Sequence, residues 1–133
     1  MKLAIDSSAF IAYFRKEPGG HLVREILLDA QNELIAHAAN LCEVYYDLLS
    51  DFPEDAAEAG LALIAAFGVI ERSDLDRDFW RTAGKHKAAL HRISLADCLC
   101  LALAQREAAV IVTCDHDFDA VADLGLCRVR FIR

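Results

Sequence analysis

Acidic residues at the ends of apolar segments are the feature that most constrains the fold of this chain. Four short stretches end in an acid: Leu3–Asp6, Ala39–Glu43, Ile93–Asp97 and Val110–Asp115. An ionised carboxylate that is buried alone is costly, so such acids need a charged partner or a metal ion. A fold that brings several of them to one point would create a site for a hard divalent cation.

The composition predicts one folded domain that spans residues 1–133. Hydrophobic residues make up 56% of the chain and charged residues 26%, which is typical of a globular protein with a substantial core. No apolar run reaches the roughly 18 residues of a membrane-spanning helix. Because Met1 and Lys2 lead directly into a strand-like segment, we expect no signal peptide and a cytoplasmic location.

The charge and the cysteine content argue against two kinds of protein: one that attracts nucleic acid over its whole surface, and one that disulfides or zinc hold together. A net charge of −7 argues against general electrostatic attraction to nucleic acid, although a local basic rim remains compatible with it. The five cysteines are odd in number and contain no CxxC pair, so a disulfide framework or a zinc site is not expected. We expect reduced, structural thiols at Cys42, Cys98, Cys100, Cys114 and Cys127.

Strand-like and helical segments alternate along the chain, and this alternation is typical of an α/β domain with a mostly parallel sheet. The predicted strands are 2–5, 33–36, 68–71, 110–113 and 127–131. The predicted helices are 9–14, 21–30, 38–52, 54–67, one from about 77 to 90, 95–108 and a short one within 118–124. The helix at 95–108 is apolar on nearly every side, so we expect it to be buried.

Two of the acids follow predicted strands, where parallel sheets bind ligands. Asp6 ends the first strand, and Asp115 follows the strand that ends at Thr113. If these strands are neighbours, the two acids meet at one edge of the sheet. Asp6 has an alternative role in capping the first helix, and Asp117 is a second candidate for the later acid.

The other two acids have plausible structural roles as well. Ser94 and Asp97 fit the S/T-x-x-D/E capping pattern at the start of a helix. Asp97 is also the only charged residue between Arg92 and Arg106, in a helix that is otherwise suited to burial. Glu43 lies nearly opposite the apolar stripe of its helix, so periodicity alone predicts a solvated surface acid.

Basic residues near these acids are candidates for binding a phosphate backbone. They are Arg15, Lys85, Lys87 and Arg92, and a solvated helix face is the alternative interpretation. Phe79 and Trp80 are expected in the core rather than as platforms for base stacking.

The four acidic motifs together resemble the PIN domain family, and in particular the small bacterial VapC-type toxin ribonucleases. The resemblance covers essentially the whole chain. The matching motifs are Ile5-Asp6-Ser7-Ser8, Glu43 on the third helix, Ser94-Leu95-Ala96-Asp97 and Thr113-Cys114-Asp115-His116-Asp117-Phe118.

The resemblance implies a three-layer α/β/α fold with a five-stranded sheet in the order 3-2-1-4-5. It also implies metal-dependent cleavage of RNA with Mg²⁺ or Mn²⁺, a homodimer and a cognate antitoxin. The catalytic acids would be Asp6, Glu43, Asp97 and Asp115, with Ser8, Thr113 and Asp117 in support.

Within this implied site the acids would have different tasks. Asp6 and Asp97 would be direct or near-direct metal ligands. Glu43 and Asp115 would hold metal-bound waters, and Asp115 is counted with Asp6 and Asp97 in the metal site.

Three other functions remain open at this point. One is a phosphatase or phosphotransfer domain with Asp6 as the nucleophile, and another is a metal- or RNA-binding module of the same fold without nuclease activity. The third is a structural partner in a complex, in which the acids only cap helices.

Overall fold

The computed structural model describes residues 1–133 and is built around a five-stranded, fully parallel sheet. The strand order is β3-β2-β1-β4-β5, which confirms the predicted order. The strands are β1 (Lys2–Ile5), β2 (Glu33–His37), β3 (Ile70–Arg72), β4 (Val110–Thr113) and β5 (Val129–Phe131). The central strands β1 and β4 are almost wholly buried, as continuous apolar strands of a parallel sheet are.

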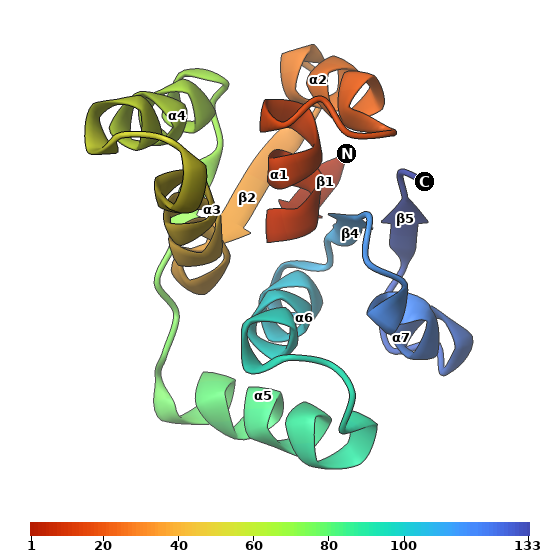
Figure 1. Cartoon of the computed structure of the whole chain (residues 1–133). Helices are drawn as coiled ribbons and strands as arrows, with labels where there is room; N and C mark the ends of the chain where they lie inside the picture. Colours follow the sequence, from red (N-terminus) through yellow and green to blue (C-terminus); the bar gives the residue numbers. More distant parts are fainter.

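Seven α-helices and one short 3₁₀ helix cover the two faces of this sheet (Figure 1). They are α1 (Ser7–Phe14), α2 (Gly20–Leu28), α3 (Ala38–Asp51), α4 (Glu54–Ala66), α5 (Arg77–Leu90), α6 (Leu95–Glu107), η1 (His116–Phe118) and α7 (Asp119–Asp123). None of these helices combines the length and the apolar character that crossing a membrane requires.

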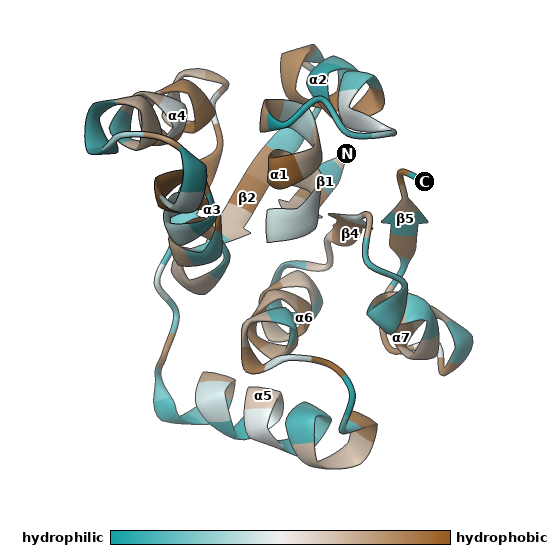
Figure 2. Ribbon diagram, viewed as in Figure 1, coloured by the Kyte–Doolittle hydropathy of each residue, from teal (hydrophilic) through white to brown (hydrophobic).

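The core is divided into two halves by the sheet, because successive strand residues point to opposite faces. On β1, Leu3 and Ile5 pack with α1–α4, whereas Ala4 packs with α5, α6 and α7. This produces the three-layer α/β/α arrangement that the resemblance implied. In Figure 2 the hydrophobic residues run along β2 between the layers, whereas α5 on the outside is largely hydrophilic.

The predicted helix α6 is buried as expected, and it is central to one half of the core. Residues from Asp97 to Ala104 are buried with the single exception of half-buried Leu99. The helix packs against β1, β2 and β4, so its first turn lies close to the carboxyl ends of these strands.

Some predicted boundaries are wrong by a few residues. The first helix begins at Ser7 rather than at residue 9, and Asp6 is its N-cap, the alternative role that the sequence allowed for this residue. The third strand begins at Ile70 rather than at residue 68, because Gly68 has a φ of 90° and ends the preceding helix. Trp80 is 46% exposed, although we expected it in the core, while Phe79 is buried as predicted.

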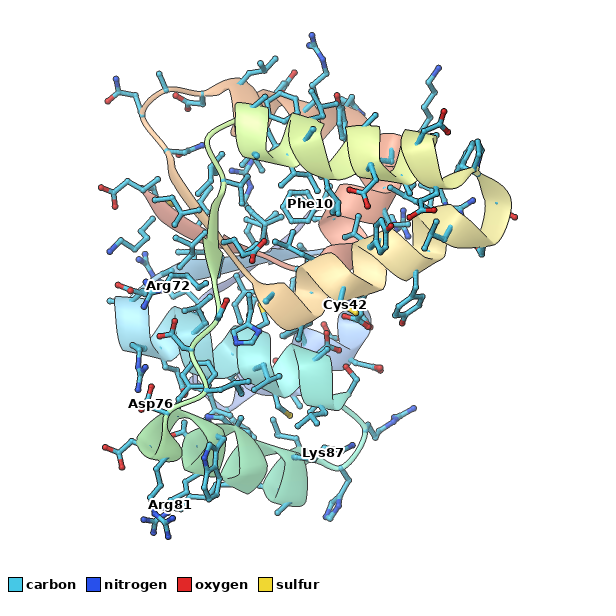
Figure 3. All side chains as sticks on the ribbon, turned by 90° about the vertical axis from the view of Figure 1, so that its left-hand side faces the viewer. Phe10, Cys42, Arg72, Asp76, Arg81 and Lys87 are labelled. Carbon is cyan, nitrogen blue, oxygen red and sulfur yellow. The ribbon has the colours of Figure 1, made fainter.

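An ion-pair network holds the long connection between β3 and α5 against the end of α6. Arg72 pairs with Asp74 at 2.9 Å and also with Glu107 of α6. Arg106 pairs with Asp74 at 2.9 Å and with Asp76, the N-cap of α5, at 2.7 Å. Figure 3 shows Arg72 and Asp76 along this connection.

Candidate active site

Asp6 lies at the carboxyl end of β1 and is 1% exposed. Its backbone N–H still donates to the carbonyl of Val112, so the ladder between β1 and β4 extends to this residue. Ile5 is in register with Val112, which places Asp6 beside Thr113 at the edge of the sheet. The structure therefore brings β1 and β4 together as the sequence analysis required, although the direct neighbour of Asp6 is Thr113 rather than Asp115.

Two hydroxyl groups fix the Asp6 carboxylate. The hydroxyls of Ser8 and Thr113 donate to its Oδ2 at 2.6 and 2.9 Å. Each hydroxyl has one proton, and both accept a backbone N–H in turn, from Cys114 and Asp115 respectively at 2.9 Å. Chains of hydrogen bonds of this kind polarise each other, so the carboxylate is held rigidly in a buried place.

Glu43 enters the site from α3 and is half-buried rather than solvated, contrary to the prediction from periodicity alone. Its Oε1 accepts a hydrogen bond from the Ser7 hydroxyl at 3.0 Å. Burial raises the pKa of Glu43, the Ser7 hydrogen bond opposes this shift, and the nearby charge of Asp6 adds to it. Glu43 is therefore a carboxyl group with an increased affinity for protons.

Asp97 is 6% exposed and lies in the first turn of α6. Its backbone N–H donates to the Ser94 hydroxyl at 3.1 Å, which confirms the predicted cap. Its side chain is close to Asp6, and burial together with this neighbour raises the pKa of Asp97 to about 8. Asp97 therefore lies in the predicted capping motif of α6 and is also part of the acidic cluster.

The structure brings together three of the four predicted acids. Asp6, Glu43 and Asp97 each contribute one oxygen to a group in which all three atoms lie within 4.8 Å of one another. The donors are carboxylate oxygens alone, without a thiolate or an imidazole, which suits Mg²⁺ or Mn²⁺ rather than zinc. On this donor chemistry the residues fit a hard divalent cation.

The fourth predicted acid lies at the margin of this cluster. Asp115 is half-buried, and its charge contributes to the raised pKa of Asp97. Its own carboxylate accepts the backbone N–H of Asp117 at 2.8 Å and so caps the short helix η1. Asp117 is exposed. Of these two residues, Asp115 is the one whose charge reaches the cluster.

Two polar residues of the site were missed by the sequence analysis. Ser7 donates to Glu43, and Asn40 is completely buried between Asp6, Glu43 and the first turn of α6. The available signal for Asn40 was its place one turn before Glu43, in a helix whose neighbouring positions are apolar.

The predicted basic residues divide into two pairs. Arg15 is bound to Asp47 at 2.8 Å and to Asp51 at 2.7 Å, so it joins α1 to α3. Lys87 donates to the backbone carbonyls of His91 and Ile93, each at 2.8 Å, and steadies the turn before α6. Figure 3 shows Lys87 beside this turn.

The other pair, Lys85 and Arg92, is exposed and forms no ion pair. These two side chains are therefore the ones available to a phosphate.

Solved structures with the same fold are toxin–antitoxin proteins. VapBC2 from Rickettsia felis, bound to a DNA fragment from its promoter, is 16% identical with a TM-score of 0.77, covering 98% of each chain. VapBC-1 from nontypeable Haemophilus influenzae is 15% identical with a TM-score of 0.75, covering 99% of this chain and 98% of the other. At these identities the likeness shows the fold alone.

A third similar structure is VapC20 from Mycobacterium tuberculosis, described as a toxin that cleaves the sarcin-ricin loop. It is 17% identical with a TM-score of 0.72, covering 90% of this chain and 94% of the other. No curated protein sequence matches the chain. The family model for the PIN domain matches residues 3–124, which is most of the chain and includes all four acids. The chain therefore belongs to the PIN domain family.

Proposed function

We propose that this protein is a metal-dependent endoribonuclease and the toxin of a toxin–antitoxin pair. The observation that carries the proposal is the convergence of Asp6, Glu43 and Asp97 from three different elements within 4.8 Å. Such a cluster is electrostatically unfavourable unless a proton or a cation is shared among its members. Family membership and the nuclease activity described for VapC20 favour a cation and a phosphodiester substrate.

In this mechanism Asp6 and Asp97 would hold Mg²⁺ or Mn²⁺, and Asp115 would contribute its charge from the margin of the cluster. A bound divalent ion would lower the pKa of the attacking water and stabilise the leaving oxygen of the phosphodiester. Asp97 has to lose its proton before it can act as a ligand. Glu43, whose pKa burial raises, is placed to accept the proton of the attacking water.

The Asp6 environment argues against the phosphotransfer alternative. Oδ2 of Asp6 already accepts hydrogen bonds from two hydroxyl groups, Oδ1 faces the buried amide of Asn40 at 3.5 Å, and the residue is 1% exposed. A nucleophilic carboxylate needs a free oxygen in line with an incoming phosphorus atom. A buried carboxylate that two hydroxyl groups hold in place by hydrogen bonds is better suited to holding a cation.

The first experiment is incubation of a total RNA pool with purified protein in Mn²⁺, in Mg²⁺ and in chelator. We expect metal-dependent cleavage that Asp6→Asn and Asp97→Asn both abolish, while Asp123→Asn, which removes an exposed acid, leaves it intact. Mn²⁺ binding by a well-folded protein that cuts no RNA would instead favour the non-catalytic binding module. Full activity of either site variant would contradict the assignment of these residues.

The antitoxin partner is part of the same proposal, and an apolar groove between α3 and α4 is the surface we assign to it. The groove encloses 320 Å³, and eight of its nine lining residues are hydrophobic. Its wall on α3 includes Cys42, which is exposed although we expected it within the apolar stripe. A partner helix could lay its apolar face into this groove, on the side of α3 that faces away from Glu43.

Ala65 offers a test of this groove because it lines the wall and is exposed. We expect Ala65→Arg to prevent co-purification with the antitoxin that this proposal assumes, whereas Ala62→Arg on the same helix should not. Equal co-purification of both variants would place the partner elsewhere.

The homodimer remains a prediction. Exposed apolar side chains on the early helices, namely Leu28, Leu49, Phe52 and Leu63, are the candidates for its interface. Light scattering on the purified protein measures its oligomeric state directly.

A further inference from the structure

Asn40 is the one neutral side chain that contacts both Asp6 and Glu43. It is 0% exposed and lies in the first turn of α3. Its Nδ2 is 3.5 Å from Oδ1 of Asp6, 3.5 Å from Oε1 of Glu43 and 3.4 Å from the carbonyl oxygen of Ala96. These three oxygens belong to the end of β1, to α3 and to the first turn of α6.

The chemistry of these neighbours determines which way the amide points. All three are acceptors, so the nitrogen with its two protons must face them, and the opposite orientation would set oxygen against oxygen. As a consequence the carbonyl oxygen of Asn40 points elsewhere, and it is the only buried side-chain polar atom of the chain without a hydrogen-bond partner.

An ordinary structural role does not account for this residue. The N-cap of α3 is His37, whose ring accepts the backbone N–H of Ala39 at 3.0 Å, so Asn40 is not needed as a cap. An apolar side chain of similar size would fill the same space without leaving a buried oxygen unpaired. Native proteins rarely leave such an atom unpaired without a functional reason.

We propose that Asn40 is the positioning residue of the metal site. Its N–H groups hold Asp6 and Glu43 at their spacing, with the partial positive charge of the amide offsetting part of their mutual repulsion. Its unpaired carbonyl oxygen accepts a hydrogen bond from water that enters with the cation, since Mg²⁺ and Mn²⁺ sites of this kind retain water. The inference rests on the proposed function, because it assumes that a divalent cation binds this cluster.

The test is titration of Mn²⁺ into the purified chain by isothermal titration calorimetry. Residues that orient metal ligands typically contribute 10–100-fold to metal affinity, so we expect Asn40→Leu to weaken Mn²⁺ binding by about that factor. Asn40→Ala should show the same loss of Mn²⁺ affinity. Because alanine is well tolerated in a helix, agreement between the two variants excludes a folding defect caused by the leucine. The matched control is Asn32→Ala, whose Nδ2 donates to the Ile26 carbonyl at 3.1 Å outside the acidic cluster.

A second measurement separates positioning from general stabilisation. The increase in melting temperature on adding Mn²⁺ should shrink in both Asn40 variants and stay at the wild-type value in Asn32→Ala. A purely structural asparagine would lower the melting temperature equally with and without Mn²⁺, leaving this increase unchanged, and that result would overturn the inference.

The outcomes distinguish this inference from the proposed function. Folded Asn40 variants that bind Mn²⁺ within twofold of wild type overturn the inference alone, and the nuclease proposal would stand. A loss of Mn²⁺ affinity in a protein that cuts no RNA supports the inference and counts against the nuclease. Wild-type protein that binds no Mn²⁺ overturns both.

Discussion

Replacing Asp97 with asparagine should change how the stability of the metal-free protein depends on pH. Asp97 is 6% exposed, and burial together with the charge of Asp6 raises its pKa to about 8. At pH 7 the group would then still be largely protonated in the folded protein. Asparagine is close in shape to this protonated form, so Asp97→Asn should fold normally.

The sign of the effect follows from the raised pKa. The unfolded chain releases the Asp97 proton near pH 3.9, whereas the folded protein keeps it until about pH 8. The folded state therefore binds more protons between these values, and the free energy of unfolding falls as the pH rises through this window. The contribution of Asp97 is complete below pH 4 and is lost by pH 8.

The magnitude is up to about 1.4 kcal/mol for each pH unit within the window. Between pH 5 and pH 7 the wild type should therefore lose up to roughly 3 kcal/mol relative to Asp97→Asn, which has no group to titrate at this position. Urea unfolding in chelator at pH 5, 6 and 7 measures this difference. Asp123→Asn, at an exposed position, is the control for the loss of one carboxylate.

The two curves of unfolding free energy against pH should diverge as the pH rises, with Asp97→Asn gaining relative to the wild type. Curves that stay parallel from pH 5 to pH 7 would show that Asp97 is ionised in the folded protein, and the argument from burial would be wrong. Mn²⁺ should reduce the fall in the unfolding free energy of the wild type with rising pH, because the cation binds the ionised carboxylate and displaces its proton.

Three other predictions concern the surroundings of the site and the fold. Thr113→Val removes a donor to Asp6 and the acceptor of the Asp115 N–H, so it should cost about 1–3 kcal/mol in urea unfolding; Thr82→Val, at an exposed helix position, should cost far less. Gly20→Ala should lower the free energy of unfolding by about 1–3 kcal/mol, because a Cβ would lie 2.4 Å from the Ala12 carbonyl oxygen. At Gly84 a Cβ would meet open space, so Gly84→Ala should stabilise α5 by about 0.5–1 kcal/mol. Lys85→Ala with Arg92→Ala should weaken RNA binding and reduce the slope of log affinity against log salt by about two, as measured by filter binding; Arg24→Ala on α2 should leave this slope unchanged.

Much of the fold was predictable because its local patterns and its global topology agree. The alternation of strands and helices gave the α/β class, and the resemblance supplied the strand order that the structure confirms. The errors lie at element boundaries, where a single cap or a glycine decides the outcome. The first helix begins at Ser7, directly after its cap Asp6, and Gly68 delays the start of β3.

The residues around the acids were harder to predict, because their roles depend on tertiary neighbours. Periodicity placed Glu43 on a solvated face, since a helical wheel does not show that α6 packs beside that face of α3. Asn40 was missed for the same reason, because its partners are 34 and 56 positions away in the sequence. The prediction of Trp80 in the core was wrong. No other layer covers the outer face of α5, and Trp80 lies on this exposed face.

The types of donor around the cluster leave its negative charge without a positively charged partner. Asp6 and Glu43 receive hydrogen bonds from Ser7, Ser8 and Thr113, and all of these donors are neutral. Arg15 is engaged with Asp47, Arg92 is exposed and unpaired, and no lysine or arginine forms an ion pair with the three clustered acids. Neutral donors orient a carboxylate without cancelling its charge, whereas a buried arginine would have satisfied the charge and occupied the place of an ion. The neutral donors therefore position the three carboxylates but leave their negative charge uncompensated. In the metal-free protein the raised pKa of Asp97 keeps a proton on the cluster, and a divalent cation would supply the positive charge in place of this proton.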